Sequence, residues 1–248
     1  MRTRVKYCGL VRPDDVDAAV GIGADAVGFV FYPKSPRLLD VAVAADLRRR
    51  LPSWVVSVGL FVNADPHEIG EIRRRVGLDV IQLHGDETPA DARALQATWW
   101  KALRIPALPG QSGSVAEGGS VAEGGSDAVG SGVAEGAADP VRRTIAASME
   151  RYRDAELCLL DSLSPGYGGS GKTFDWSLIP PEAGRRLIMS GGLDELNVAA
   201  AIESIAPFAV DTSSGIQGQN PREKDVGRME QFMEAVRLAD GRRKPHQR

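Results

Sequence analysis

The chain has 248 residues, of which 43% are apolar, and its 30 Lys and Arg nearly balance its 33 Asp and Glu, for a formal net charge of -3. These values exclude a wholly disordered or collagen-like chain and give no reason to expect a nucleic acid or an acidic membrane as partner. No apolar run approaches the ~18 residues of a membrane span. Two cysteines, Cys8 and Cys158, are too few for a disulfide scaffold. We therefore expect a soluble cytoplasmic protein.

Strand-like and helix-like segments alternate along the chain. Short apolar runs predict eight strands, at 5–10, 26–32, 55–62, 80–84, 100–105, 157–161, 187–190 and 208–211. Helices are predicted from Pro13 onward and at 41–51, 66–76, 88–98, 141–153, 197–205 and 223–238. The sixth unit has no clear helix, because Pro180 and Pro181 follow the short segment 177–179.

Eight strand–helix repeats predict parallel strands joined by crossover helices. We expect one α/β domain over residues 1–240, a closed (β/α)8 TIM barrel with a degenerate sixth helix. A doubly wound open sheet is the alternative, but the first strand is not followed by the glycine fingerprint of that fold.

Residues 109–139 interrupt this pattern after the fifth strand. The unit Ser-Val-Ala-Glu-Gly-Gly occurs at 114–119 and again at 120–125, and two good copies are too few for a solenoid. The segment holds five acidic residues and no Lys or Arg, and its small side chains cannot bury enough surface to offset the entropy of ordering. We predict a flexible insertion in a surface loop, and a solvated basic tail at 241–248.

Barrels of this kind carry their chemistry at the carboxyl ends of the strands. The predicted strands end in Cys8, His84, Asp161, Ser190 followed by Gly191, and Asp211. A period of two places Lys6 with Cys8, Gln82 with His84, and Asp211 with Ser213. Taken singly, Cys8 could be a small buried hydrophobe, His84 a hydrogen-bonded core residue and Asp161 a loop cap or a partner of Lys172. Their shared position at strand ends favours an active site. Cys158, in contrast, lies three residues before Asp161, so its side chain should point to the other face of the strand and pack against the helices.

A glycine-rich segment, 166–173, matches the P-loop pattern. A P-loop must open a helix, however, and this one runs toward Pro180 and Pro181. We instead expect Gly168, Gly169, Ser170, Gly171 and Lys172 to form a mobile loop over the barrel mouth. The preferred phosphate site lies after strands seven and eight, where backbone N–H groups are exposed at Gly191, Gly192, Ser213, Ser214 and Gly215.

Several of these segments also carry a family resemblance. They are 5–10, 28–31, 34–37, 59–63, 82–85, 168–176, 190–193 and 211–215. From about residue 4 to about residue 238 the chain resembles the phosphoribosylanthranilate isomerases of tryptophan biosynthesis. It departs from their usual pattern in the insertion 109–139 and in Tyr7, which stands where a smaller or aliphatic residue usually precedes the cysteine.

The resemblance implies an Amadori rearrangement of a small phosphorylated substrate, N-(5-phosphoribosyl)anthranilate, to the 1-deoxyribulose 5-phosphate form. It implies Cys8 as general base, Asp161 as general acid and Arg37 as a contact of the anthranilate group. It also implies neither metal nor organic cofactor, and we expect a monomer or a homodimer. The remaining candidate substrate-binding residues are Lys6, Gln82, His84 and Asp211.

The two catalytic roles require opposite protonation states at the start of the reaction. Asp161 must carry a proton, so its pKa should be raised, and Cys8 must lose one, so its pKa should be lowered. Lys6 is a candidate positive neighbour for the thiol.

Two alternatives stay open on the sequence. A histidine-pathway or dual-substrate isomerase runs the same rearrangement but is expected to have an aspartate where Cys8 stands. A noncatalytic phosphosugar-binding barrel would need neither Cys8 nor Asp161.

Overall fold

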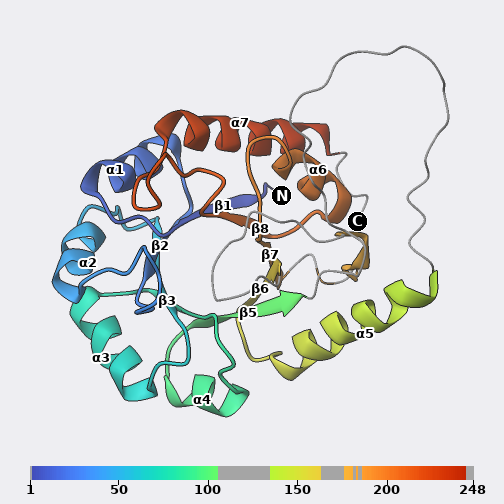
Figure 1. Cartoon of the computed structure of the whole chain (residues 1–248), viewed down its shortest axis with the longest axis horizontal. Helices are drawn as coiled ribbons and strands as arrows, with labels where there is room; N and C mark the ends of the chain where they lie inside the picture. The colour runs from blue at the N-terminus through green and yellow to red at the C-terminus, as the bar shows by residue number, and fades with distance from the viewer. Residues whose placement is uncertain (1, 106–134, 163–175, 181–182, 184–185, 244–248) are drawn as a thin grey trace.

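The computed structural model describes residues 2–105, 135–162, 176–180, 183 and 186–243. Eight parallel strands hydrogen-bond in chain order, and β8 pairs with β1 to close the barrel. Figure 1 looks into this ring of strands, with helices arranged around its outside. The predicted (β/α)8 TIM barrel is confirmed.

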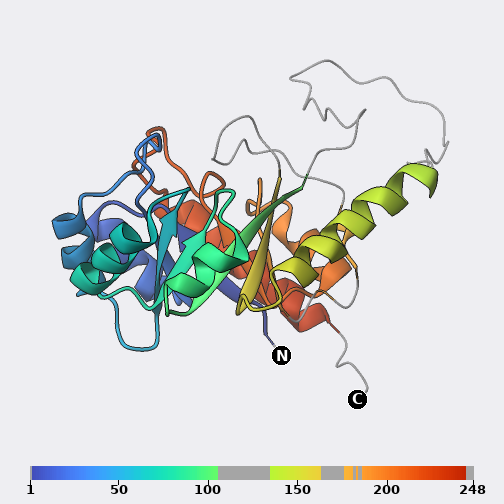
Figure 2. The same ribbon diagram turned by 90° about the horizontal axis from the view of Figure 1, so that it is seen from below.

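The eight strands are short and most of their residues are buried. They are β1 (Arg4–Cys8), β2 (Ala26–Val30), β3 (Val56–Phe61), β4 (Val80–Leu83), β5 (Trp99–Ile105), β6 (Leu157–Ser162), β7 (Leu187–Met189) and β8 (Ala209–Thr212). In Figure 2 the start of β1 lies at the lower edge of the barrel and the carboxyl end of β5 at the upper edge.

The helices follow the strands in the order that the sequence predicts. They are α1 (Pro13–Ile22), α2 (Val41–Arg48), α3 (Pro66–Val76), α4 (Pro89–Ala94), α5 (Glu135–Arg151), α6 (Val198–Ile205) and α7 (Val226–Arg242). After β6 the described residues hold a short 3-10 helix, η1 (Trp176–Leu178), which confirms the degenerate sixth helix. In the described part of the chain, no helix is long and apolar enough to cross a membrane.

Three helix boundaries differ from the prediction by four residues or more. The helix predicted at 88–98 is α4, which ends at Ala94, because Gln96 adopts a positive φ of 47°. α5 begins at Glu135, inside the predicted insertion 109–139, where Ala137 and Ala138 favour a helix. α7 runs to Arg242, into the predicted tail 241–248, since a basic residue is favourable in the last turn of a helix. Residues 106–134 and 244–248 lie outside the described part.

The interior of the barrel is apolar below the predicted site. A cluster of inward-facing side chains fills it, consisting of Ala26, Val58, Val80, Trp100, Ala102, Leu157, Leu159, Ile188 and Ala209. Two residues further along their strands, the inward positions become polar, as with Gln82 after Val80, Asp161 after Leu159 and Asp211 after Ala209. Cys158 belongs instead to the larger cluster between strands and helices, as predicted. The fold therefore confines chemistry to the carboxyl ends of the strands.

Candidate active site

A pocket opens at the carboxyl ends of the strands, and most of the predicted site residues line it. Ten of them do so: Cys8, Arg37, Gln82, His84, Asp161, Gly191, Gly192, Asp211, Ser213 and Ser214. Two others, Lys6 and Gly215, are not among the residues that line it. The predicted loop residues Gly168, Gly169, Ser170, Gly171 and Lys172 lie outside the described part. Among the described residues, no three His, Cys, Asp or Glu side chains are grouped so as to hold a metal ion.

Cys8 is the last residue of β1, and its side chain fits beside a glycine of the neighbouring strand. Cys8 pairs with Gly28 in the β1–β2 ladder. A Cβ atom at Gly28 would lie 2.8 Å from the Cys8 Sγ and 3.2 Å from the Lys6 Cε. The thiol and the lysine therefore occupy the space that a larger β2 residue would take.

Lys6 is buried beneath the pocket and forms an ion pair there. Its Nζ lies 2.7 Å from Asp211 Oδ1, and the two side chains are 2% and 6% exposed. The Ser190 hydroxyl donates a hydrogen bond of 3.1 Å to the other oxygen of Asp211. Burial lowers the pKa of Lys6, but the negative charges of Asp211 and Cys8 outweigh it, so its pKa is raised overall. Lys6 is therefore a fixed cation beside the thiol rather than a group on the pocket surface.

The pKa of Cys8 moves in the direction opposite to the one expected from the sequence. Burial raises the pKa of this thiol, and the favourable charge of Lys6 lowers it by less. Asp211 contributes to the rise, because its carboxylate lies near the same group. The expectation of a lowered pKa is wrong for the protein without substrate, and the main reason is that the thiol is buried, with the carboxylate of Asp211 acting in the same direction.

On the opposite side of the mouth, Asp161 lies at the carboxyl end of β6 and contacts a histidine. His84 Nε2 is 3.1 Å from Asp161 Oδ2, and the Gln82 amide nitrogen is 3.0 Å from His84 Nδ1. All three side chains are buried. The inward face of β4 thus extends into a row of hydrogen-bonding groups that fixes the position of the Asp161 carboxyl group.

The loops after β7 and β8 present backbone donors to the pocket. Gly191 and Gly192 have positive φ angles of 84° and 67°, a conformation that turns successive N–H groups to one side. Within the described residues, no acceptor takes a hydrogen bond from either of these N–H groups. The Ser213 hydroxyl donates to the Cys8 carbonyl at 2.9 Å, which joins the loop after β8 to the strand that carries the thiol.

Gly215 lies behind these loops. A Cβ atom there would be 2.0 Å from the Leu193 carbonyl oxygen, so the loop after β8 packs directly on the loop after β7. Thr212 strengthens this contact by donating to the same carbonyl at 2.7 Å. Gly215 therefore supports the shape of the loops instead of facing the pocket.

Two features of the pocket were not predicted. An apolar wall is formed by Val30, Leu60 and Val62, which line it from β2 and from β3 and its end. The period of two that places Gln82 beside His84 could have found these residues. The second feature is the neighbourhood of Arg37.

Arg37 lies over the pocket next to a buried lysine. Its Nε donates to the Pro221 carbonyl at 3.1 Å, and its Nη2 donates to Gln217 Oε1. Lys224 is 4% exposed and donates to the Ser213 carbonyl at 2.7 Å. Burial and the positive charge of Arg37 lower the pKa of Lys224 to about 7. Lys224 follows no predicted strand, so no pattern in the sequence points to it.

A comparison with protein families identifies the chain's relatives. The family model for N-(5'phosphoribosyl)anthranilate (PRA) isomerase matches residues 5–121 and 138–235. The chain belongs to this family. The stretch between the two matched ranges falls within the predicted insertion.

Curated relatives and solved structures of PRA isomerases match over nearly the whole chain. The N-(5'-phosphoribosyl)anthranilate isomerase of Leptothrix cholodnii is 42% identical over 97% of this chain and 94% of its own. That of Methylibium petroleiphilum is also 42% identical, over 98% and 97%. The crystal structure of the Thermotoga maritima enzyme has a TM-score of 0.75 at 35% identity, covering 95% of this chain and 99% of that one.

One solved PRA isomerase holds a ligand. It is a complex with reduced 1-(o-carboxyphenylamino)-1-deoxyribulose 5-phosphate, with a TM-score of 0.73 and 32% identity over 95% of this chain and 99% of that one.

Proposed function

We propose that this PRA isomerase family member converts N-(5-phosphoribosyl)anthranilate into 1-(2-carboxyphenylamino)-1-deoxyribulose 5-phosphate, a step of tryptophan biosynthesis. The observation that carries the proposal is the arrangement of Cys8 on β1 and Asp161 on β6 at one pocket, with backbone donors after β7 and β8. Family membership supports the same reaction.

The pocket offers a separate contact for each part of the substrate. The phosphate dianion suits the N–H groups of Gly191 and Gly192, together with the loop of Ser213. The anthranilate ring suits the apolar wall of Val30, Leu60 and Val62, and its carboxylate suits Arg37. These contacts would hold the ribose ring between the two catalytic side chains.

The first step is acid catalysis by Asp161. Its carboxyl group gives a proton to the ring oxygen of the ribose, the bond from that oxygen to C1' breaks, and a protonated imine forms. His84 is suited to assist, because its Nε2 lies 3.1 Å from Asp161 Oδ2. The Gln82 amide nitrogen donates to His84 Nδ1, which leaves the ring proton on Nε2, so His84 donates to Asp161 and would stabilise the carboxylate that remains after the proton transfer.

The second step is base catalysis by Cys8. The thiolate removes the proton from C2', and the electron pair moves toward the imine nitrogen to give an enolamine. A proton then returns to C1' while the C2' hydroxyl loses its own, which yields the ketone with no net oxidation. The raised pKa of Cys8 means that the thiolate is a minor form in the free protein, and a cationic imine next to it would favour its formation.

Two experiments test the proposed activity. The gene should restore growth of a tryptophan auxotroph that lacks this isomerase. The purified chain should convert the substrate to a product with a ketone carbon in its 13C NMR spectrum, since substrate and product have the same mass. Turnover of the histidine-pathway aminoaldose instead would favour the alternative isomerase. Binding without turnover of either compound would favour a noncatalytic barrel.

The oligomeric state stays a prediction of monomer or homodimer. One solved relative is described as monomers generated from the dimeric enzyme of Thermotoga maritima.

A further inference from the structure

A buried ion pair lies next to the site, and the mechanism above does not use it. Lys101 of β5 and Glu87, which lies just before α4, are paired at 2.9 Å between Nζ and Oε2. Their side chains are 3% and 5% exposed. A buried ion pair stabilises a fold little compared with apolar side chains of the same volume, so stability alone is a weak reason for it.

Lys101 holds the backbone on both sides of His84. Its ammonium group donates to the Gly85 carbonyl at 2.6 Å and to the Leu83 carbonyl at 3.4 Å, in addition to Glu87. An ammonium group has three protons, so these contacts use all of them. The two residues that flank His84 in the chain are therefore tied to the same group on β5.

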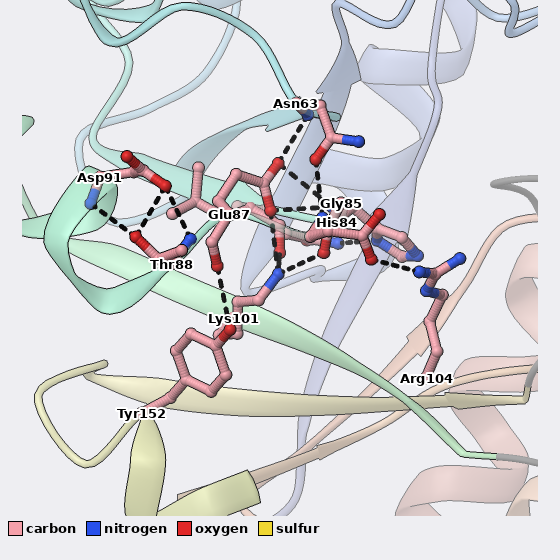
Figure 3. A network of polar contacts seen from close by, with 12 residues as sticks. Asn63, His84, Gly85, Glu87, Thr88, Asp91, Lys101, Arg104 and Tyr152 are labelled. Atoms are coloured by element: carbon pink, nitrogen blue, oxygen red, sulfur yellow. Dashed lines mark hydrogen bonds and ion pairs between the residues drawn. The ribbon is translucent and has the colours of Figure 1, made fainter.

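Glu87 also holds the backbone of the turn at residues 84–86. Its carboxylate accepts from the Gly85 N–H at 2.9 Å and from the Asn63 N–H at 2.8 Å. Its backbone carbonyl accepts from the Tyr152 hydroxyl at 2.9 Å. Figure 3 shows these contacts converging on the turn that carries His84. The turn is thus tied to the end of β3, to β5 and to the end of α5.

The same turn has little room to relax. A Cβ atom at Gly85 would lie 2.2 Å from Asn63 Oδ1 and 2.8 Å from the Asn63 backbone nitrogen. The Asn63 side chain in turn accepts from the Asp86 N–H at 2.7 Å. A turn packed this closely leaves little space for its backbone to shift near His84.

We propose that Glu87 and Lys101 are positioning residues, which fix the backbone of His84 and through its imidazole hold the Asp161 carboxyl group in place. The proposal rests on the proposed function only in taking Asp161 as the acid. Its structural part, that the pair fixes the His84 ring, can be tested independently of the reaction.

The test uses isosteric variants that remove the charges. Lys101→Met and Glu87→Gln each break the pair, and the double variant Glu87→Gln/Lys101→Met removes both charges, so no unpaired buried charge remains to unfold it. The matched control is Thr3→Val, which removes a partly buried hydrogen bond of 2.7 Å from the Thr3 hydroxyl to Asp240, at the start of β1 and so at the other end of the barrel.

The kinetic result expected is a loss of kcat with little change of KM. A displaced catalytic group costs up to about 100-fold, so we expect kcat to fall about 10- to 100-fold in the double variant. KM should stay within about twofold, because Arg37 and the glycine loops proposed to bind phosphate follow other strands, β2, β7 and β8. Thr3→Val should keep the wild-type kcat even if it unfolds more easily. Equal kcat in the double variant and wild type would overturn the proposal.

A double-mutant cycle asks whether the pair acts through His84. In a His84→Ala background, Lys101→Met should lower kcat by much less than it does in the wild type, because the group that it positions is already gone. Fully additive losses in kcat would show that the pair acts on catalysis by another route and would overturn the assignment.

A third readout is independent of turnover. The chain has three histidines, His67, His84 and His246, so the imidazole signals in a 15N NMR spectrum can be assigned with His84→Ala. In the double variant the His84 signals should shift or broaden, while those of His67 stay as they are. Unchanged His84 signals would overturn the proposal. A chain that shows the expected signals but fails to turn over the substrate would refute the proposed function alone.

Discussion

Gly28→Ala tests whether the pocket depends on the space that β2 leaves for the Cys8 thiol. The added Cβ would lie 2.8 Å from Cys8 Sγ, 3.2 Å from Cys8 Cα and 3.2 Å from Lys6 Cε, so the sulfur must move. Overpacking of this kind typically costs about 1–3 kcal/mol. A thiol displaced from the reacting carbon should also lower kcat, by about 10- to 100-fold.

A second substitution and a control can show that the clash with the Cys8 thiol causes the loss of stability. In a Cys8→Ala background the closest contact disappears, so Gly28→Ala should destabilise that protein by clearly less than it does the wild type. Gly70→Ala in α3 meets nothing within 4 Å and should be neutral or stabilising by up to about 1 kcal/mol. Urea unfolding followed by circular dichroism gives the stabilities, and steady-state kinetics give kcat. Wild-type stability and kcat in Gly28→Ala would refute the reasoning.

The phosphate loops, the insertion and the thiol each give a further expected outcome. Gly192→Asp should raise KM about tenfold or more, because it adds bulk and a like charge opposite the dianion, and an unchanged KM would move the phosphate site elsewhere. Replacing residues 110–134 with a short Gly-Ser link should leave kcat nearly unchanged, since loop length costs only ~0.6 kcal/mol per doubling, and at low salt kcat/KM should rise slightly as acidic residues are lost. A folded deletion variant with a large drop in kcat would show that the segment acts on the substrate. Alkylation of Cys8 should keep accelerating above pH 9, because its pKa is raised, and a rate that levels off below pH 8 would contradict this.

The sequence predicts the barrel well because the same strand–helix pattern occurs eight times along the chain. Each strand is an apolar run, and eight of them in alternation with helices leave few other folds. Helix ends are predicted less well, because they depend on local conformations such as the positive φ of Gln96, which shortens α4. The helical start of α5 was hidden because Glu135 and Gly136 repeat the Glu-Gly pair of the copies at 114–119 and 120–125.

The sequence predicts which residues line the site, but it does not predict their pKa values. Strand period two brings Cys8, His84 and Asp161 to one pocket, since it depends only on backbone geometry. The pKa of Cys8 depends instead on how far the thiol is buried and on whether Lys6 already has a partner, and neither can be derived from spacing. Lys101 did carry a signal, a charged residue between the apolar residues Trp100 and Ala102 of β5, although its partner Glu87 has none.

The central claim is that Cys8 and Asp161 perform the rearrangement as base and acid. Its most direct test is kcat/KM of the purified chain on N-(5-phosphoribosyl)anthranilate, measured for the wild type, Cys8→Ala and Asp161→Asn. We predict that the wild type is active and that each folded variant loses about 10²- to 10⁴-fold, the usual contribution of a general acid or base. Near-wild-type kcat/KM in either variant, with its circular dichroism unchanged, would contradict the role assigned to that residue.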